Sequence, residues 1–134
     1  LATLEVILEV LGTNFSAFFS EEKEPQIVFT KEEQFIKSFD GYDITWLVPA
    51  SQRLMMEPIL MEISPYSQSL EDAPHDGQEF GYILEGQVEI VYGNKTTKCS
   101  KGEAFYIETN KSHYLKNSSN RKARLIWVST PPTF

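Results

Sequence analysis

The chain has 134 residues, of which 41% are hydrophobic and 13% aromatic, so it can fold as one globular domain with a buried core. Its formal net charge of −7 argues against this chain binding nucleic acid by itself, because phosphate binding uses clustered lysine and arginine. The single cysteine, Cys99, excludes an internal disulfide and a cysteine metal cluster, and fits a reducing cytoplasm.

The pattern of the first residues is not that of a signal peptide or a membrane anchor. The segment from Leu1 to Val6 has no basic stretch and includes Glu5, and no apolar run reaches the length of a bilayer span. We therefore expect a cytoplasmic protein without membrane contact. Because the first residue is leucine rather than methionine, we also expect the chain to be a fragment of a longer protein.

The first nineteen residues have a helical pattern. Leucines recur at spacings of three and four, which places them on one helical face, and Gly12 follows where a helix would end: Leu1, Leu4, Leu8 and Leu11. Asn14 is suited to cap a second short helix that carries Phe15, Phe18 and Phe19. Residues 20–25 are charged, contain Pro25 and read as a linker.

From Gln26 onward the pattern is that of β-strands. Short runs rich in valine, isoleucine and aromatic residues alternate with turn pairs such as Glu85-Gly86, Gly93-Asn94 and Lys101-Gly102. Such spacing predicts an all-β sandwich or barrel. The predicted strands are Ile27–Thr30, Asp43–Val48, Pro58–Ile63, Glu79–Leu84, Gln87–Tyr92, Thr96–Cys99, Ala104–Ile107, His113–Asn117 and Arg124–Ser129.

One stretch has two interpretations. Thr30 and Glu33 have the spacing of a capping box, which favours a helix over Lys31–Phe35. The alternation of Phe35 and Phe39 with other residues favours a strand instead. We expect a strand here.

The two histidines of the chain, His75 and His113, stand in informative surroundings. Their neighbours fall at the spacing of the two motifs of the cupin superfamily: His75, Glu79, Gly86, Gly102, His113 and Asn117. The chain thus resembles a cupin. This resemblance implies an all-β fold, the double-stranded β-helix or jelly-roll barrel, here with a short N-terminal helical segment.

The departures from the cupin motifs concern the metal site. Ala73 occupies the position of the first motif histidine, while Glu108 and Asn110 replace a proline and a glycine. The resemblance implies that His75, Glu79 and His113 remain from a metal site of three histidines and a glutamate. Two imidazoles and a carboxylate can form a facial site for a divalent transition metal. The alternative is that the three side chains are hydrogen-bonded remnants that hold no metal.

The period of a strand predicts which side chains face the barrel interior. If Glu79 points inward, so do Gly81 and Ile83, and if His113 points inward, so do Leu115 and Asn117. Gly81 would leave open space in the barrel. A few polar groups in an apolar cavity suit a small ligand. The predicted ligand-binding residues are His75, Glu79, Gly81, Ile83, His113, Leu115, Tyr82 and Trp127, with Met61 and Tyr106 as residues that line the cavity or pack in the core.

The N-terminus resembles the end of a lambda-repressor-like helix-turn-helix domain of the XRE type. The resemblance rests on Thr3-Leu4, Leu11-Gly12 and Phe18-Phe19, followed by the charged linker. Glu57-Pro58 and the ending Thr130–Phe134 also resemble regulators that join such a domain to a cupin. We expect residues 1–19 to be a remnant of the helix-turn-helix domain, 20–25 a linker and 26–134 a cupin sensor domain.

The expected function is therefore sensing rather than catalysis. A small-molecule effector would bind in the barrel of a homodimer and change DNA binding, which occurs only through the full-length protein. One alternative is a metal-dependent oxygenase or isomerase that uses His75, Glu79 and His113. Another is a dimerisation module with a filled barrel and no ligand.

Overall fold

A computed structural model describes residues 24–134 of the chain. The helices predicted within residues 1–19 lie outside the described residues, as does most of the predicted linker. Within the described part, no helix is long and apolar enough to cross a membrane.

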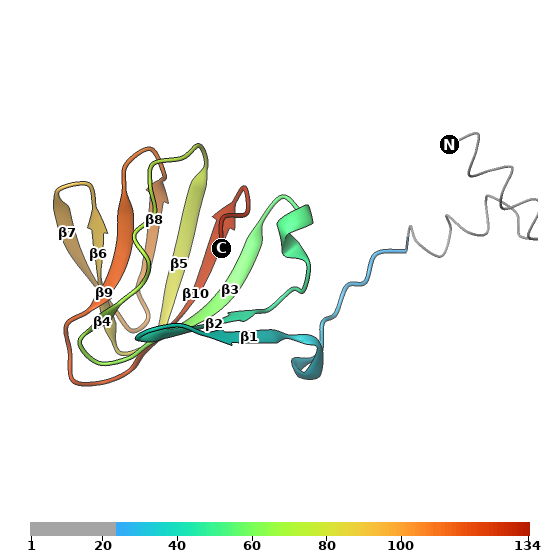
Figure 1. The fold of residues 1–134 in the computed structure, drawn as a ribbon, viewed down its shortest axis with the longest axis horizontal. Helices are drawn as coiled ribbons and strands as arrows, with labels where there is room; N and C mark the ends of the chain where they lie inside the picture. The colour runs from blue at the N-terminus through green and yellow to red at the C-terminus, as the bar shows by residue number, and fades with distance from the viewer. Residues whose placement is uncertain (1–23) are drawn as a thin grey trace, which may run out of the picture.

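The predicted all-β class is confirmed, since the chain forms two antiparallel sheets. The larger sheet has the order β1-β2-β3-β10-β5-β8 and the smaller sheet has the order β4-β9-β6-β7. Figure 1 shows β1, in teal, beside the blue segment that leads into it, at the end of the molecule away from β7. The strands are β1 Phe35–Ser38, β2 Tyr42–Trp46, β3 Glu57–Ile63, β4 Ser67–Gln68, β5 Gln78–Glu85, β6 Gln87–Tyr92, β7 Lys95–Ser100, β8 Ala104–Glu108, β9 His113–Asn117 and β10 Ala123–Thr130.

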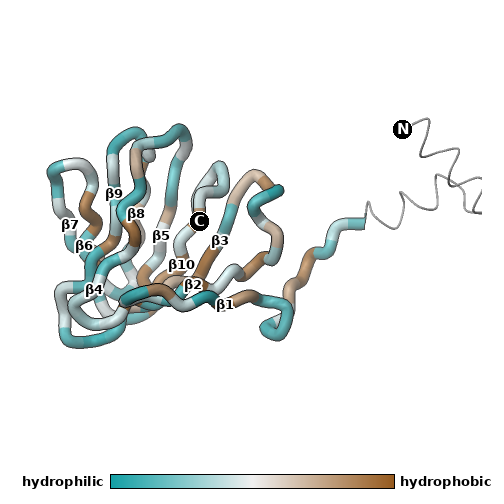
Figure 2. Tube along the Cα trace, in the orientation of Figure 1, coloured by the Kyte–Doolittle hydropathy of each residue, from teal (hydrophilic) through white to brown (hydrophobic). Residues whose placement is uncertain are grey.

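The core follows from strict alternation in β3 and β10. In both strands every second residue is buried, and the buried residues are mostly large and apolar. Met61 pairs with Leu125 and Ile59 with Trp127 across the two strands, which places their side chains on the inner face. Figure 2 shows hydrophobic residues in the strands and a hydrophilic connection between β9 and β10.

The predicted turn at Gly86 forms between β5 and β6. Gly86 has a φ of +74°, a left-handed value that side chains with a Cβ rarely adopt. A Cβ at this position would also lie 2.8 Å from the carbonyl oxygen of Lys122. The glycine therefore permits both the turn and the close approach of the next segment.

The predicted strand Ile27–Thr30 is wrong. This segment is not assigned to any strand, and the side chains of Ile27 and Val28 are 85% and 73% exposed. A strand needs a hydrogen-bonding partner, and no strand of residues 24–134 pairs with this segment. The run of β-branched and aromatic residues favours a strand, but residues 24–134 offer it no partner strand.

The stretch from Lys31 to Ser38 contains both a short helix and a strand, one after the other. Lys31–Glu33 forms a 3₁₀ helix whose N-terminus carries the capping box of Thr30 and Glu33. The chain then turns into β1 at Phe35, the expected strand, whose four residues are all exposed. β4 is an additional strand of two residues that the sequence pattern did not indicate.

Candidate functional site

Three side chains that the sequence singled out converge at one point inside the barrel. Glu79 lies on β5, His113 begins β9, and His75 lies in the loop that precedes β5. Their ligand-type nitrogen and oxygen atoms lie within 4.8 Å of one another. We call these three residues the His/Glu/His cluster. Glu79 and His113 are 1% exposed, so the cluster is largely removed from water.

Hydrogen bonds orient both imidazole rings in the same way. Nδ1 of His113 lies 2.9 Å from the carbonyl oxygen of Lys111, and Nδ1 of His75 lies 3.1 Å from that of Asp76. A carbonyl oxygen only accepts, so Nδ1 carries the hydrogen in each ring. In the neutral rings, Nε2 therefore has a free lone pair that faces the cluster.

The Nε2 atoms face carboxylate oxygens, which are also acceptors. Nε2 of His113 lies 3.1 Å from Oε2 of Glu79 and 3.5 Å from Oδ2 of Asp72. Nε2 of His75 lies 3.4 Å from the same Glu79 oxygen, and this buried nitrogen has no hydrogen-bond partner. Lone pairs that face one another need a proton or a cation between them.

The surroundings of His113 favour its protonated form. Burial acts to lower the pKa of His113, but the hydrogen bonds that its ring donates to Glu79 and to the Lys111 carbonyl oxygen, with the charges of Glu79 and Asp72, outweigh it and raise the pKa. Burial is the main cause that raises the pKa of Asp72, with a smaller contribution from the charge of Glu79. A proton is therefore held more firmly here than in water.

The donor set also fits a divalent transition metal. Two neutral imidazole nitrogens and one carboxylate are the ligands of facial metal sites, and the unpartnered Nε2 of His75 is what such a site would leave without its ion. Ala73, at the position of the fourth cupin ligand, is exposed and offers no donor atom. The cluster can thus hold a metal through three residues.

Glu79 connects the cluster to a tryptophan. Its second oxygen, Oε1, accepts a hydrogen bond of 2.8 Å from the indole Nε1 of Trp127 on β10. Trp127 is 1% exposed and packs edge-on against Phe105 and Phe134. One carboxylate therefore positions both the histidines and an indole ring.

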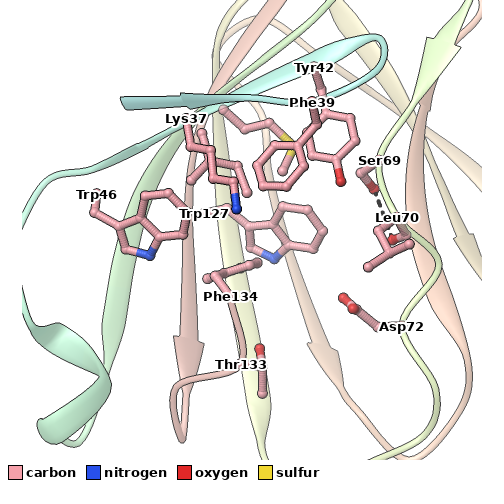
Figure 3. Close-up of a pocket in the computed structure, with 12 residues that line it drawn as sticks. Lys37, Phe39, Tyr42, Trp46, Ser69, Leu70, Asp72, Trp127, Thr133 and Phe134 are labelled. Atoms are coloured by element: carbon pink, nitrogen blue, oxygen red, sulfur yellow. Dashed lines mark hydrogen bonds between the residues drawn. The ribbon is translucent and has the colours of Figure 1, made fainter. Parts of the chain in front are cut away.

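A cavity of about 280 Å³ has Trp127 in its wall. Figure 3 shows aromatic rings around it, with the Lys37 ammonium and the Asp72 carboxylate on either side of Trp127. Asp72 belongs both to this cavity and to the surroundings of His113, so the cavity adjoins the cluster. The residues that line it are Lys37, Phe39, Tyr42, Ile44, Trp46, Met61, Ser69, Leu70, Asp72, Trp127, Thr133 and Phe134.

Several predicted ligand residues occupy other places. Ile83 and Leu115 point inward as predicted, but they are buried in the core and do not line this cavity. The open space predicted at Gly81 is absent, because a Cβ there would lie 2.0 Å from the Phe105 ring. Phe105 fills the volume that Gly81 leaves, so the glycine serves ring packing.

Tyr82 does not line this cavity. It lies between the inward residues Gly81 and Ile83, so it projects from the opposite face of β5 and is 40% exposed. Tyr106 on β8 is likewise 61% exposed, while Met61 and Trp127 do line the cavity. The alternation of side chains along β5 places Glu79 on the inner face and Tyr82 on the outer face.

A second buried glutamate was missed by the sequence reasoning. Glu57 on β3 is 0% exposed; its Oε2 accepts 2.8 Å from the Trp46 indole and its Oε1 accepts 2.7 Å from the backbone nitrogen of Phe134. Trp46 and Phe134 are walls of the cavity. The signal was available, because Glu57 stands in register with the buried residues Ile59, Met61 and Ile63.

The chain is similar in sequence to cupin domains and to a transcriptional regulator. The family model Cupin_2, described as a cupin domain, matches residues 59–129. The HTH-type transcriptional regulator PuuR of Escherichia coli (strain K12) is 27% identical over 137 aligned positions, which cover 100% of this chain and 74% of PuuR.

Solved structures share the fold at lower identity. The Cupin_2 domain of an XRE family transcriptional regulator from Enterobacter cloacae has a TM-score of 0.62 at 19% identity and covers 69% of this chain and 99% of that domain. HppE in its Fe(II) form has a TM-score of 0.68 at 22% identity, with coverage of 96% and 75%. KdgF from Halomonas sp. has a TM-score of 0.67 at 13% identity, with coverage of 81% and 96%.

Proposed function

This chain belongs to the cupin domain family, and from that premise we propose that it is the effector-sensing part of a transcriptional regulator. The likeness to PuuR along the whole chain supports a regulator, as does the fold shared with the XRE family cupin domain. In this proposal residues 1–19 end the helix-turn-helix domain, residues 20–25 link it to the sensor, and the protein acts in the cytoplasm.

The observation that carries the sensing role is the cavity beside Trp127. Its volume of about 280 Å³ is near the lower end of ligand pockets, which suits a small molecule. Aromatic and aliphatic side chains supply most of its wall, and the Asp72 carboxylate and Lys37 ammonium supply charge. We propose that the effector binds here, next to the His/Glu/His cluster rather than within it.

The same cavity lies close along the chain to the predicted DNA-binding remnant. Lys37 is on β1, and Tyr42 and Trp46 are on β2, the first two strands after the linker. A ligand that holds this hairpin in one arrangement would also hold the segment that leads into it. It can shift DNA binding only if it binds the two arrangements with different affinity.

We propose that two copies associate through the N-terminal edge of the larger sheet. β1 is an edge strand, and apolar side chains are exposed on it and on the segment before it: Ile27 85%, Val28 73%, Phe35 59% and Ile36 64%. An exposed apolar edge invites another strand. The matching occupant is the same edge of a second copy, because helix-turn-helix domains bind symmetric half-sites as dimers.

Association can be tested by analytical ultracentrifugation. Ile36→Glu should convert the dimer to a monomer, because it places a charge in the paired edge. Tyr106→Glu, on the opposite edge strand β8, is the matched control and should remain dimeric. A dimer that survives Ile36→Glu but dissociates with Tyr106→Glu would place the contact elsewhere.

The sensing role can be tested on the full-length regulator bound to its operator DNA. A small-molecule fraction from the host cells should change the DNA affinity of the wild type. Leu70→Trp places a large ring at the edge of the cavity and should abolish this response, whereas Leu54→Trp, at another exposed leucine away from the cavity, should keep it. An unchanged response in Leu70→Trp would contradict the proposed effector site.

A second candidate function rests on the unpartnered Nε2 of His75. This nitrogen, with Glu79 and His113, would hold a divalent metal, which supplies Lewis-acid or redox chemistry when bound. The remaining residues would orient a substrate in the adjoining cavity. Elemental analysis of purified protein tests this candidate: near-stoichiometric metal that is lost in His113→Ala supports an enzyme, and metal-free protein that binds an organic ligand supports the sensor alone.

A further inference from the structure

We infer that the cavity takes a small zwitterion, a molecule with an ammonium group at one end, a carboxylate at the other and a hydrocarbon body between them. This inference rests on the proposed effector site and names the chemical class of its ligand. It follows from which polar groups of the cavity are already bound within the protein and which are not.

The neutral polar groups already have partners. The Ser69 hydroxyl accepts a 2.9 Å hydrogen bond from the backbone nitrogen of Leu115, and the hydroxyls of Thr133 and Ser129 lie 2.7 Å apart. The Tyr42 hydroxyl lies close to the backbone of Leu70. A ligand gains little from groups whose hydrogen bonds are already made.

The Asp72 carboxylate, by contrast, has capacity left. Its only ion-pair contact among residues 24–134 is the His113 Nε2 at 3.5 Å, a long contact that His113 shares with Glu79. Glu79 and Asp72 thus both face the Nε2 of His113, and the Glu79 oxygen is the nearer of the two. Because Asp72 also lines the cavity, its carboxylate can pair with an ammonium group that enters there.

Lys37 supplies the opposite charge at the other side of the cavity. It forms no ion pair with any of the residues 24–134, and its ammonium lies 5.1 Å from the centre of the Phe39 ring. Figure 3 shows this ammonium directed toward Trp127, and Lys37 and Asp72 line the same cavity. A ligand carboxylate is the natural partner for this group.

The wall between the two charges is apolar. Trp127, Phe134 and Met61 offer ring faces and a thioether, with no further charge to be matched. Such a surface favours a short hydrocarbon chain over a second charged or strongly hydrated group. The positions of Lys37 and Asp72 thus select against a ligand with two ammonium groups as well as against one with two carboxylates.

The test compares ligands of one skeleton that differ in their end groups. Binding of ε-aminocaproate and its shorter homologues δ-aminovalerate and γ-aminobutyrate is measured by isothermal titration calorimetry with the full chain. The comparison ligands are hexylamine, hexanoate and hexamethylenediamine. We expect at least one of the zwitterions to bind about tenfold more tightly than each comparison ligand of single or doubled charge.

Two variants test which protein side chain binds each charged end of the ligand. Lys37→Met should remove the preference for the zwitterion over hexylamine, and Asp72→Asn should remove the preference over hexanoate. Lys95→Met and Asp43→Asn, which carry the same changes away from the cavity, should keep both preferences. Circular dichroism confirms that each variant is folded, so that loss of preference is not loss of structure.

The outcomes separate this inference from the proposed function. Tighter binding of hexamethylenediamine, or no binding of any zwitterion in the series, overturns the ligand class. If the host-cell fraction still acts through the cavity by the Leu70→Trp criterion, the sensing role stands with a different ligand. If Leu70→Trp leaves that response unchanged, the effector site itself is wrong.

Discussion

Two buried glutamates hold the two tryptophans of the cavity in nearly the same way, and yet their remaining contacts differ. Glu57 and Glu79 are 0% and 1% exposed, and each accepts a 2.8 Å hydrogen bond from an indole nitrogen. The second oxygen of Glu57 accepts a backbone N–H, that of Phe134. The second oxygen of Glu79 faces two imidazole nitrogens.

This difference separates a structural role from a chemical one. Both partners of Glu57 are permanent N–H donors, so neither of them can gain a proton or bind a metal. The imidazole partners of Glu79 can carry a proton, hold a metal or present lone pairs. Of the two carboxylates that shape the cavity, only Glu79 belongs to a group whose state can vary.

The largest expected effect is the loss of the Glu57 carboxylate. Glu57→Ala leaves the Trp46 indole and the Phe134 backbone nitrogen without an acceptor inside the protein, and should cost about 3–5 kcal/mol of unfolding free energy. Urea unfolding followed by circular dichroism measures it. Glu108→Ala, on the exposed face of β8, is the control and should cost less than about 0.5 kcal/mol. Equal costs would show that Glu57 does not hold the cavity wall.

Glutamine substitutions at Glu57 and Glu79 should lower the unfolding free energy by different amounts. In Glu57→Gln one amide N–H must face another donor, because both partners donate, and we expect a cost of about 2 kcal/mol. In Glu79→Gln the amide can donate to the Nε2 lone pairs while its oxygen keeps the Trp127 hydrogen bond, so the cost should stay below about 1 kcal/mol. The reverse order of costs would contradict the assigned imidazole orientations.

Added metal should act on only one of the two regions. At a Zn²⁺ concentration tenfold above its Kd, we expect the unfolding free energy of the wild type to rise by about 1.4 kcal/mol. The same increase is expected in Glu57→Gln but not in Glu79→Gln or His113→Ala, because the latter two lose a ligand of the His/Glu/His cluster. Stabilisation that persists in His113→Ala would place the bound ion elsewhere.

The smallest expected effect is a dependence of stability on pH. The folded-state pKa of His113 is raised above its ordinary value of 6.5, so the folded protein holds this proton more firmly than the unfolded chain. Its contribution is fully present below pH 6.5 and is lost as the pH rises through the folded pKa. Unfolding in urea at a series of pH values should show this decline in the wild type and in Glu57→Gln, and a flatter profile in His113→Gln. A decline that His113→Gln retains would assign it to another group.

The sequence predicted the members of the cluster because motif spacing and strand period both bear on them. Glu79 and His113 stand at cupin positions and in the buried phase of their strands, and both indications agree. The prediction of open space at Gly81 was wrong, because the Phe105 ring on the neighbouring strand β8 fills that space. The spacing of residues along one strand does not show which side chains of the next strand lie beside it. Asp72 was also missed, because it lies outside the motifs and meets His113 through an isolated β-bridge.

The strand prediction for Ile27–Thr30 failed for a different reason. The residues Ile27–Thr30 have the pattern of a strand, but pattern describes the segment and not the partner that it needs. The larger strands were predicted to within a few residues because each has neighbours in the same chain. Where the partner strand would come from a second molecule, the sequence shows the tendency of a segment to form a strand but not the partner.

Both tryptophans of the chain, Trp46 and Trp127, line the same cavity. The ultraviolet emission of the protein when its indoles are excited therefore arises at the wall of a single site, without background from indoles elsewhere. Replacement of either ring by phenylalanine would leave one emitter, held by Glu57 in one case and by Glu79 in the other. The protein thus carries two intrinsic optical reporters, one for the structural carboxylate and one for the chemically variable carboxylate, in a cavity small enough for one ligand to contact both.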